Sequence, residues 1–566
     1  MRDSDNNRRS YIVFCMKNQY TYQLSNNWGF AFPILAVLVG VAVNMLALPF
    51  NVDTLYDEGY LYLSVEDARH GMIDGLSQWA PLVITLLGNE VCSSILLLRI
   101  VRLALALLTG ILFVLVTHTI AENKREKIQY AILSFLLLVP SMGGLIISYN
   151  GLAQFFQILA CASLYRLLTD EKVGFNVIWA IMTGFLITAS IFIILPSAVL
   201  LGVCTILLVC VRYWREWKSM LMYLAGGLSG ILLALLFIHC FVADLTGIIH
   251  AMQTTAQTVT TLDRGYDPFT FVTKILLFLR DWLLCICVLI GIVVISVKLQ
   301  SYSKILAFVF YAVTILLYLK YQQKPMVTLP MAMIVLWIIS CRKQVDRITK
   351  QTILNDKALF ESFLLFFPLI ASIGTNVYLG GKMTFFIMPW ALGLWMMGFN
   401  KDVELKKESL LVLSIVLLMG SWNQFKSIDY SYSRVQEGAL KGMYLNPMQE
   451  EHFATVDSIV KTYGFKKGES VVFFTQLSSM TECYLGGAKC GNYFQPMDFV
   501  AHAQDSLPAP DFLFLCKYDE DIAGETLQQM DWGWPEEFDK YYVGSPDALY
   551  VGYPTERWLY CRKIVK

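Results

Sequence analysis

Charged residues are scarce in this sequence of 566 residues. Only 16% are Asp, Glu, Lys or Arg, against about 25% in ordinary soluble domains. Hydrophobic residues make up 56%, and the mean hydropathy is +0.54. This shortage of charge excludes an ordinary soluble globular protein. Apolar runs of about 18 or more residues, each long enough to cross a hydrocarbon core of roughly 30 Å, recur along most of the chain. The sequence therefore predicts a polytopic helical membrane protein.

Other familiar features are also missing. No CxxC or Cys/His spacing of a zinc site occurs, and His70 and His250 have no ligand spacing around them. No internal repeat of the kind seen in many transporters is evident. No cleavable signal peptide is evident either, because residues 1–27 are polar and the first apolar run, 28–50, is long enough to span. We interpret that run as a signal anchor with the N-terminus in the cytoplasm.

The placement of charge sets the expected topology. With the first run, we expect about thirteen spans. The others are predicted near 92–118, 129–148, 151–168, 175–192, 195–212, 220–243, 282–299, 304–320, 326–341, 358–378, 383–398 and 408–424. Short cationic loops follow every second span, at 122–127, 212–218, 298–304, 341–350 and 400–407. The positive-inside rule puts these loops in the cytoplasm and sends the C-terminal tail to the outer, periplasmic face of the cytoplasmic (inner) membrane.

An acidic segment, 51–75, directly follows the first apolar run. It carries one formal cation, Arg69, against the carboxylates of Asp53, Asp57, Glu58, Glu66, Asp67 and Asp74. Two interpretations stay open: solvated carboxylates or caps of an interfacial helix, or a functional pair held at the membrane surface. Tyr60 and Tyr62 suit that surface, and 79–88 reads as a short apolar segment lying along it.

Arg99 and Arg102 lie in the second predicted span. An arginine inside the bilayer costs about 2.5–3.5 kcal/mol on insertion scales, so each side chain is expected to have a polar partner. The spacing i, i+3 places both on one helix face. Either they reach back to the headgroups or a neighbouring helix, or they form a phosphate site within reach of Asp57, since a guanidinium matches phosphate geometry.

Three motifs together resemble the GT-C superfamily of membrane glycosyltransferases. They are "YDEGYLYLS", "WAPL" and "LRIVRLALALLTG", all between residues 51 and 115. The pattern is most similar to the protein O-mannosyltransferases and the lipid A aminoarabinose transferases, and the outer tail also resembles the bacterial oligosaccharyltransferases. The resemblance implies a GT-C-like fold and transfer of a sugar from a polyprenyl phosphate or diphosphate carrier, usually with inversion.

The resemblance also implies roles for named residues. Asp57 stands at the position of the catalytic base, and Glu58 would orient the acceptor or tune Asp57. Arg99 or Arg102 would bind the donor phosphate by motif position. The further candidates for phosphate binding, by topology alone, are Arg264, Lys320, Lys324 and Lys382. The residues expected to contact the acceptor or the sugar are Tyr60, Tyr149 and Asn150.

The sequence departs from the family pattern in its second outer turn. Many relatives place another acidic residue there, but this turn reads "ISYNGLAQF" and has no carboxylate. Either Asn150 substitutes as a hydrogen-bonding group, or no second acid is needed. The missing carboxylate weakens the case for a divalent metal; Asp263 and Asp267 could supply ligands, but we do not favour a metal cofactor. The segment 372–386 either brings Lys382 to a ligand or is a tight interhelical turn.

The tail, 425–566, changes character. Segments 469–476, 510–519 and 557–565 read as strands and 446–464 as a helix, which predicts a small extracytoplasmic α/β domain covering the site formed by the membrane module, 1–424. The tail holds four cysteines: Cys483, Cys490, Cys516 and Cys561. They form disulfides, with Cys483–Cys490 the most local pair, or are buried free thiols.

Two other classes of function compete with a transferase. A transporter or flippase of a lipid-linked or anionic substrate would also bury arginines along its path, and a scaffold would use the tail to bind envelope proteins. The expected partners of a transferase are a polyprenyl phosphate-linked sugar, membrane lipids and an envelope acceptor, with no nucleic acid.

Overall fold

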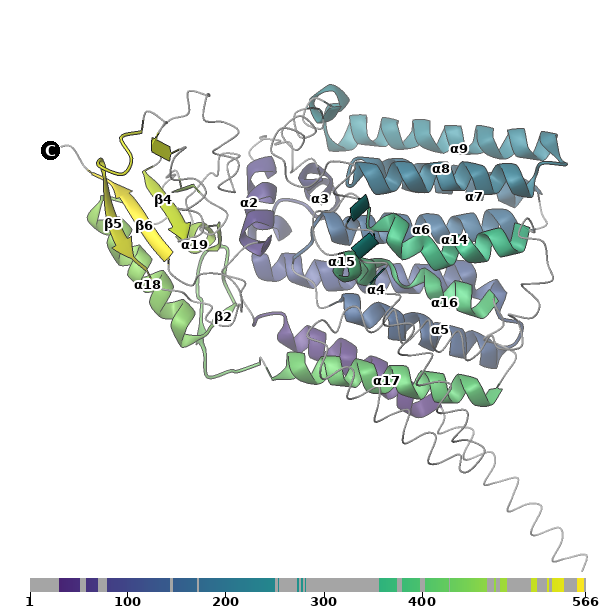
Figure 1. Ribbon diagram of the computed structural model, residues 1–566, viewed down its shortest axis with the longest axis horizontal. Helices are drawn as coiled ribbons and strands as arrows, with labels where there is room; N and C mark the ends of the chain where they lie inside the picture. Colours follow the sequence, from purple (N-terminus) through teal and green to yellow (C-terminus); the bar gives the residue numbers. More distant parts are fainter. Residues whose placement is uncertain are drawn as a thin grey trace, which may run out of the picture.

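The computed structural model describes most of the membrane region and parts of the tail. Described residues are 30–50, 57–69, 79–142, 146–170, 173–249, 356–373, 379–396, 403–426, 428–465, 473–474, 479–485, 511–516, 527–528, 532–543 and 557–563, with six single positions between 253 and 280. A helix bundle carries the tail at one end, which we call the tail end of the bundle (Figure 1). The chain is thus a mostly helical protein with small C-terminal sheets.

Five described helices are long and apolar enough to cross a membrane. They are Phe30–Ala47, Ile95–Ile120, Tyr149–Thr169, Leu195–Arg212 and Trp217–Val242. Bundle helices, as bounded in the structure, are α4 (Ile95–Thr117), α5 (Lys124–Leu138), α6 (Tyr149–Thr169), α7 (Val173–Ile191), α8 (Leu195–Arg212), α9 (Trp217–Phe237), α14 (Asp356–Ala371), α15 (Leu379–Phe386), α16 (Pro389–Leu394) and α17 (Val403–Phe425). The spans expected at 282–299, 304–320 and 326–341 lie outside the described residues, so a total of thirteen stays a prediction.

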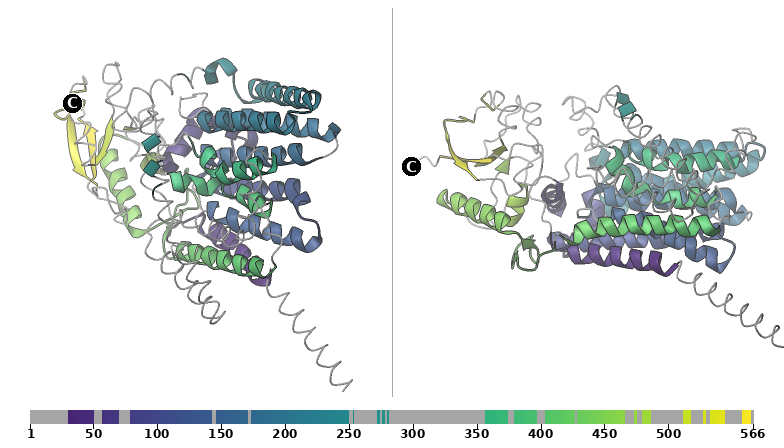
Figure 2. Two further views of the ribbon diagram at one scale, coloured as in Figure 1. Left: turned by 45° about the vertical axis from the view of Figure 1, so that its right-hand side comes forward. Right: turned by 60° about the horizontal axis from the view of Figure 1, so that its bottom comes forward.

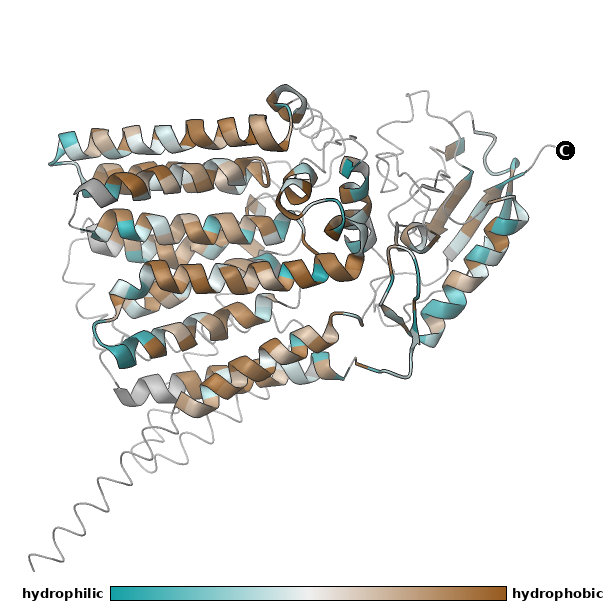
Figure 3. Cartoon of the chain, turned by 180° about the vertical axis from the view of Figure 1, so that it is seen from behind, coloured by the Kyte–Doolittle hydropathy of each residue, from teal (hydrophilic) through white to brown (hydrophobic). Residues whose placement is uncertain are grey.

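Helix α6 lies at the centre of the bundle, and 89% of the residues in its 18-residue apolar stretch are buried. The outer helices α7 and α9 meet through glycines: a Cβ at Gly230 would lie 2.0 Å from the carbonyl oxygen of Ile181. The first helix runs beside α17 (Figure 2), and Gln424 Nε2 donates to Asn44 Oδ1 at 3.2 Å. Apolar residues dominate the bundle helices, whereas hydrophilic residues gather where α5 and α9 begin, away from the tail (Figure 3). This distribution fits helices that cross a bilayer.

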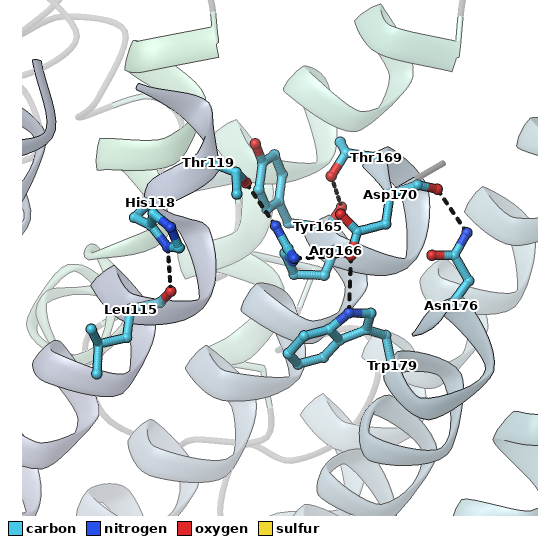
Figure 4. Close-up of polar contacts among 9 residues, drawn as sticks. All are labelled: Leu115, His118, Thr119, Tyr165, Arg166, Thr169, Asp170, Asn176 and Trp179. Carbon is cyan, nitrogen blue, oxygen red and sulfur yellow. Dashed lines mark hydrogen bonds and ion pairs between the residues drawn. The ribbon is translucent and has the colours of Figure 1, made fainter. Parts of the chain in front are cut away.

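At the end of the bundle away from the tail, a cluster of polar contacts around Arg166 connects the helix ends (Figure 4). Arg166 Nη2 forms an ion pair with Asp170 at 3.0 Å, and Nη1 donates to Thr119 Oγ1 at 3.0 Å. Trp179 Nε1 donates to Asp170 Oδ2 at 3.1 Å. These contacts join the ends of α4 and α6 to α7, and the arginine charge is matched within the cluster itself.

Between bundle and tail lie two short helices, α2 (Asp57–Arg69) and α3 (Ala80–Leu87), and the 3-10 turn η1 (Val91–Ser93). Figures 1 and 2 both show α2 between the bundle and the tail. Residues 57–69 of the acidic segment are thus helical. Leu61, Leu63 and Val65 are buried, and Tyr62 donates from its hydroxyl to the carbonyl of Ser93 at 3.1 Å. Apolar packing therefore fixes α2 on the end of the bundle.

The tail contains a four-stranded sheet in the order β3-β4-β6-β5. Its strands are β3 (Phe473–Phe474), β4 (Phe512–Cys516), β5 (Phe538–Tyr542) and β6 (Arg557–Arg562), preceded by a two-stranded ribbon of β1 (Ser433–Arg434) and β2 (Tyr444–Leu445). The β3–β4 pair is parallel and the other two pairs are antiparallel. The three expected strand regions are confirmed, and β5 is an addition that the sequence did not predict.

Helix α18 (Pro447–Thr462) covers one face of this sheet. It begins with a capping box, in which Asn446 and Gln449 exchange side-chain-to-backbone hydrogen bonds, and ends before Gly464, whose φ is 86°. The helix predicted at 446–464 is confirmed. Its cap and its terminal glycine are the signals that fix its ends.

The thiol of Cys561 is free and fully buried beneath α18. Burial, together with the nearby carboxylate of Asp539, raises its pKa to about 12. Cys490 lies outside the described residues, as does the side chain of Cys516. Cys483 is present as a buried thiol, so the local pair of Cys483 with Cys490 is not formed in this structure, and the alternative of buried thiols holds for Cys483 and Cys561.

Candidate functional site

A buried ion pair joins α2 to the start of α4. Arg99 Nε and Nη2 donate to Glu58 Oε1 and Oε2, both at 2.5 Å. The side chain of Glu58 is 0% exposed and that of Arg99 is 7% exposed. Arg99 was a candidate for binding the donor phosphate by motif position, but its guanidinium is in direct contact with Glu58. A bidentate pair of this kind is strong and directional because two parallel hydrogen bonds fix both side chains.

The same arginine also holds the end of the first helix segment. Arg99 Nη1 donates to the carbonyl oxygens of Leu48 at 2.6 Å and of Phe50 at 2.5 Å. Residues 51–56 connect Phe50 to α2, so Arg99 pins both ends of this connection. Arg99, one turn into α4, therefore holds Glu58 of α2 beside the end of the first helix segment.

Arg102 lies one turn further along α4 and is only 2% exposed. Its Nη2 donates to the carbonyl oxygen of Ser141 at 3.0 Å and to Gln154 Oε1 at 2.9 Å. The guanidinium carbon lies 5.6 Å from the ring centre of Phe385. Its Nη1 is buried without a hydrogen-bond partner, and no carboxylate forms an ion pair with it in the described part of the chain.

Space for the Arg102 side chain depends on a glycine in α6. A Cβ at Gly151 would lie 2.8 Å from Arg102 Cδ and 2.9 Å from Nε. Contacts this short cannot coexist with the present position of a side chain that is buried on every side. Gly151 therefore lets the arginine lie flat against α6.

Lys382 reaches the start of α6 from α15. Its Nζ donates to Asn150 Oδ1 at 3.0 Å and to the Tyr149 hydroxyl at 3.3 Å, and it lies 4.9 Å from the centre of the Tyr149 ring. The lysine is 8% exposed. The amide of Asn150 thus serves as a hydrogen-bonding group in the turn that lacks a carboxylate.

The two cations lie close together at the tail end of α6. Asn150 and Gln154 are one helical turn apart on α6, and their partners are Lys382 and Arg102. Lys382 and Phe385 are likewise one turn apart on α15, and Phe385 lies against Arg102. One turn is about 5.4 Å, so the α6 partners of the two positive groups lie about that far apart along one face of the helix.

The structure brings together some of the sequence-predicted site residues. Glu58 and Arg99 pair directly, and Tyr149, Asn150 and Lys382 form one cluster. Arg264, Lys320 and Lys324 lie outside the described residues. The backbone of α2 includes Asp57 and Tyr60, but their side chains are not among those described. In the described ranges no three His, Cys, Asp or Glu side chains come together as a metal site would need.

Sequence reasoning missed the neutral residues around Arg102. Ser141 and Gln154 hydrogen-bond to each other as well as to the arginine, and Gly151 makes room for it. The signal was present in α6, where Asn150 and Gln154 stand at i, i+4 in a mostly apolar run. Polar residues at that spacing lie on one face of a helix, and that face holds both cations.

Comparisons with known proteins give matches among solved structures only. No family model matches the sequence, and no curated protein matches it. The chain is similar to the crystal structure of the Archaeoglobus fulgidus oligosaccharyltransferase in complex with Zn and sulfate, with 12% identity, 94% of this chain and 73% of that chain covered, and a TM-score of 0.46. It is also similar to ArnT from Cupriavidus metallidurans bound to undecaprenyl phosphate, with 11% identity, coverage of 95% and 98%, and a TM-score of 0.44. These similarities concern the course of the chain alone.

Proposed function

We propose that this protein is a membrane glycosyltransferase of the GT-C type that takes a sugar from a polyprenyl phosphate-linked donor. The observation that carries the proposal is the buried Arg102, whose Nη1 has no partner in the described part of the chain. Its partner Gln154 lies one turn along α6 from Asn150, the partner of Lys382. A buried guanidinium is costly unless its donors are satisfied. The phosphate of a membrane-embedded donor has the charge and the acceptor oxygens to satisfy it.

The residues divide into two groups by their contacts. Arg102 and Lys382 bind the donor phosphate and stabilise the negative charge that grows on it as the bond to the anomeric carbon breaks. Glu58 and Arg99 hold the start of α2, so in our proposal Arg99 positions Asp57 instead of binding phosphate. This assigns the two arginines of the motif to different tasks.

Asp57 acts as the general base in this proposal. It accepts the proton of an acceptor hydroxyl while the acceptor oxygen attacks the anomeric carbon and the carrier phosphate leaves on the opposite side. One displacement of this kind inverts the anomeric configuration. Asp57 is the first residue of α2 and directly precedes Glu58, which pairs with Arg99. Arg99 lies one turn before Arg102 on α4. The base and the phosphate site therefore lie at the same end of the bundle in this proposal.

The tail end of the bundle faces the outside of the cytoplasmic membrane in this proposal. The short cationic loops 122–127 and 212–218 lie at the other end, where the positive-inside rule expects the cytoplasm. The donor lipid would reach the site from the bilayer, and the acceptor would come from the outer side, beside the tail.

The test is transfer of radiolabelled sugar from a polyprenyl phosphate-linked donor by the purified protein in lipid. We expect Asp57→Asn to abolish transfer while donor binding is retained, because the change removes the base and leaves the phosphate site intact. Glu66→Gln is the matched control: it changes a carboxylate on the same helix that pairs with Arg69, and it should transfer normally. Normal transfer by Asp57→Asn would contradict the catalytic assignment.

A further inference from the structure

The tail touches both ends of the connection that leads to Asp57. At the first end, the Phe50 ring stacks on Tyr444, with ring centres 4.7 Å apart and planes 17° apart. Tyr430 meets the same phenylalanine edge-on at 4.9 Å. The backbone N–H of Tyr444 donates to the carbonyl oxygen of Pro49 at 2.8 Å. Phe50 is 0% exposed, so this contact is a packed one.

At the other end, a tail helix lies against α2. Helix α19 (Ser479–Leu485) packs along α2, and Cys483 donates from Sγ to the carbonyl oxygen of Gly59 at 3.7 Å. Gly59 directly follows Glu58. Met480 and Cys483 belong to the same continuous apolar cluster as Leu61 and Leu63 of α2.

The tail also contacts the start of α4, the helix that carries both arginines. The backbone N–H of Ile95 donates to the carbonyl oxygen of Ala439 at 3.0 Å. Gly442, with φ of 87°, would place a Cβ 2.9 Å from the Leu96 side chain. The tail is therefore packed onto the elements that hold the site, and their apolar core is shared.

We propose that Tyr444 and Cys483 are positioning residues through which the tail fixes the start of α2, and hence the base, relative to the donor phosphate. This inference rests on the proposed function for its catalytic consequence. Arg99 holds the same two ends from the bundle side, so the start of α2 lies between Arg99 on one side and Tyr444 and Cys483 on the other. We call Arg99 the bundle clamp and Tyr444 with Cys483 the tail clamp. Misplacement of a reacting group by about 1 Å costs up to roughly 100-fold in rate, so a loosened clamp should lower turnover without weakening donor binding.

The experiment uses the full-length protein with Tyr444→Ala or Cys483→Leu, the second of which adds volume against Gly59. Tyr542→Ala is the matched control, because Tyr542 is a tail tyrosine that packs on Trp558 at 5.2 Å in the sheet. Hydrogen exchange in residues 57–69 and label transfer are measured for each. Both clamp variants should exchange about 10-fold faster in 57–69, which corresponds to about 1.4 kcal/mol. Tyr444→Ala loses an aromatic contact, and Cys483→Leu forces α19 away from Gly59.

The same variants should lose about 10- to 100-fold in kcat with donor KM within about twofold, while Tyr542→Ala matches the wild type. Exchange in α18 reports whether the tail itself stays folded. If Cys483→Leu unfolds the tail, Tyr444→Ala alone carries the test, because Tyr444 lies outside the four-stranded sheet. Unchanged exchange in 57–69 with α18 intact would overturn the inference. If the wild-type protein transfers no sugar, the proposed function fails, and the exchange measurement still decides whether the tail positions α2.

Discussion

The guanidinium of Arg102 illustrates how one residue defines the site. On insertion scales an arginine in the middle of a span costs about 2.5–3.5 kcal/mol, and Arg102 recovers part of this through Ser141 and Gln154. In the proposed function, its Nη1 donates to an oxygen of the donor phosphate. Arg99, one turn away, has its nitrogens bound to Glu58 and to backbone carbonyls. Two arginines one turn apart on the same helix thus differ in whether the described part of the chain satisfies all of their hydrogen-bond donors.

We expect Arg102→Leu to weaken donor binding by about 10- to 100-fold, because hydrogen bonds to charged groups contribute about 1.5–3 kcal/mol. Arg102→Lys should recover only part of this loss, since lysine keeps the charge and lacks the planar fork. Binding of the polyprenyl phosphate alone, measured by calorimetry in detergent, reports the effect without turnover. Arg166→Leu is the control, because Arg166 pairs with Asp170 at the other end of the bundle. Equal loss in both variants would contradict a phosphate role for Arg102.

Gly151→Ala tests the same site without changing a charge. The added Cβ would meet Arg102 Cδ and Nε at under 3 Å, so the guanidinium must move. We expect a donor-binding defect in the same direction as that of Arg102→Leu. In contrast, Gly420→Ala in α17, where the added Cβ meets nothing within 4 Å, should bind normally.

At the scale of elements, the pair of Glu58 and Arg99 connects α2, α4 and the end of the first helix. Removing one partner of a buried ion pair typically costs about 3–5 kcal/mol, whereas replacing both by apolar residues is often neutral. We therefore expect Arg99→Leu to lower the melting temperature strongly and the double variant Arg99→Leu with Glu58→Leu to recover much of it. Transfer activity should stay low in both, because α2 has lost its clamp.

A thermal scan of the single and double variants in the same detergent gives the answer. Arg69→Leu provides the control, since Arg69 pairs with Glu66 at the partly exposed end of α2, and exposed pairs contribute about 0–1 kcal/mol. A double variant no more stable than Arg99→Leu would mean that the pair is not the clamp described here.

Elements with a strong local signal were predictable from the sequence, and those that depend on distant contacts were not. Helix α18 carries a capping box and a terminal glycine, and β4 and β6 are apolar runs, so each was expected. Strand β5, "FDKYY", carries two charged residues and forms because β6 offers a pairing edge. Helix α2 carries acidic residues near both of its ends and is stabilised by packing on the bundle and on α19, whose Cys483 is 424 residues from Gly59 in sequence.

The candidate site shows the same division. The spacing of Arg99 and Arg102 correctly placed both on α4 near the acidic segment. Which of them meets Glu58 depends on the direction in which α2 returns to the bundle, and this follows from tail contacts at Phe50 and Gly59. Periodicity along one helix contains no information about such contacts.

For the whole molecule, the two ends of the bundle differ in composition. The tail and α2 lie at one end, and the loop 212–218 at the other carries Arg212, Arg215 and Lys218 with exposed tryptophans. Tryptophans at that level suit the boundary between bilayer and water. If the positive-inside rule decides the orientation, the loop lies in the cytoplasm and the tail lies outside.

Cysteine labelling in intact cells tests this orientation. Trp214 and Tyr542 are 76% and 58% exposed, so Trp214→Cys and Tyr542→Cys each present a thiol to water at opposite ends of the molecule. A membrane-impermeant maleimide, small enough to cross a bacterial outer membrane if one is present, should label Tyr542→Cys directly. Trp214→Cys should be labelled only after the cytoplasmic membrane is permeabilised. The unmodified protein gives the background from its own thiols, of which Cys240 is exposed. Labelling of Trp214→Cys in intact cells, with Tyr542→Cys protected, would invert the topology and put α2 and its ion pair on the cytoplasmic side, where the outer-face reaction proposed here could not take place.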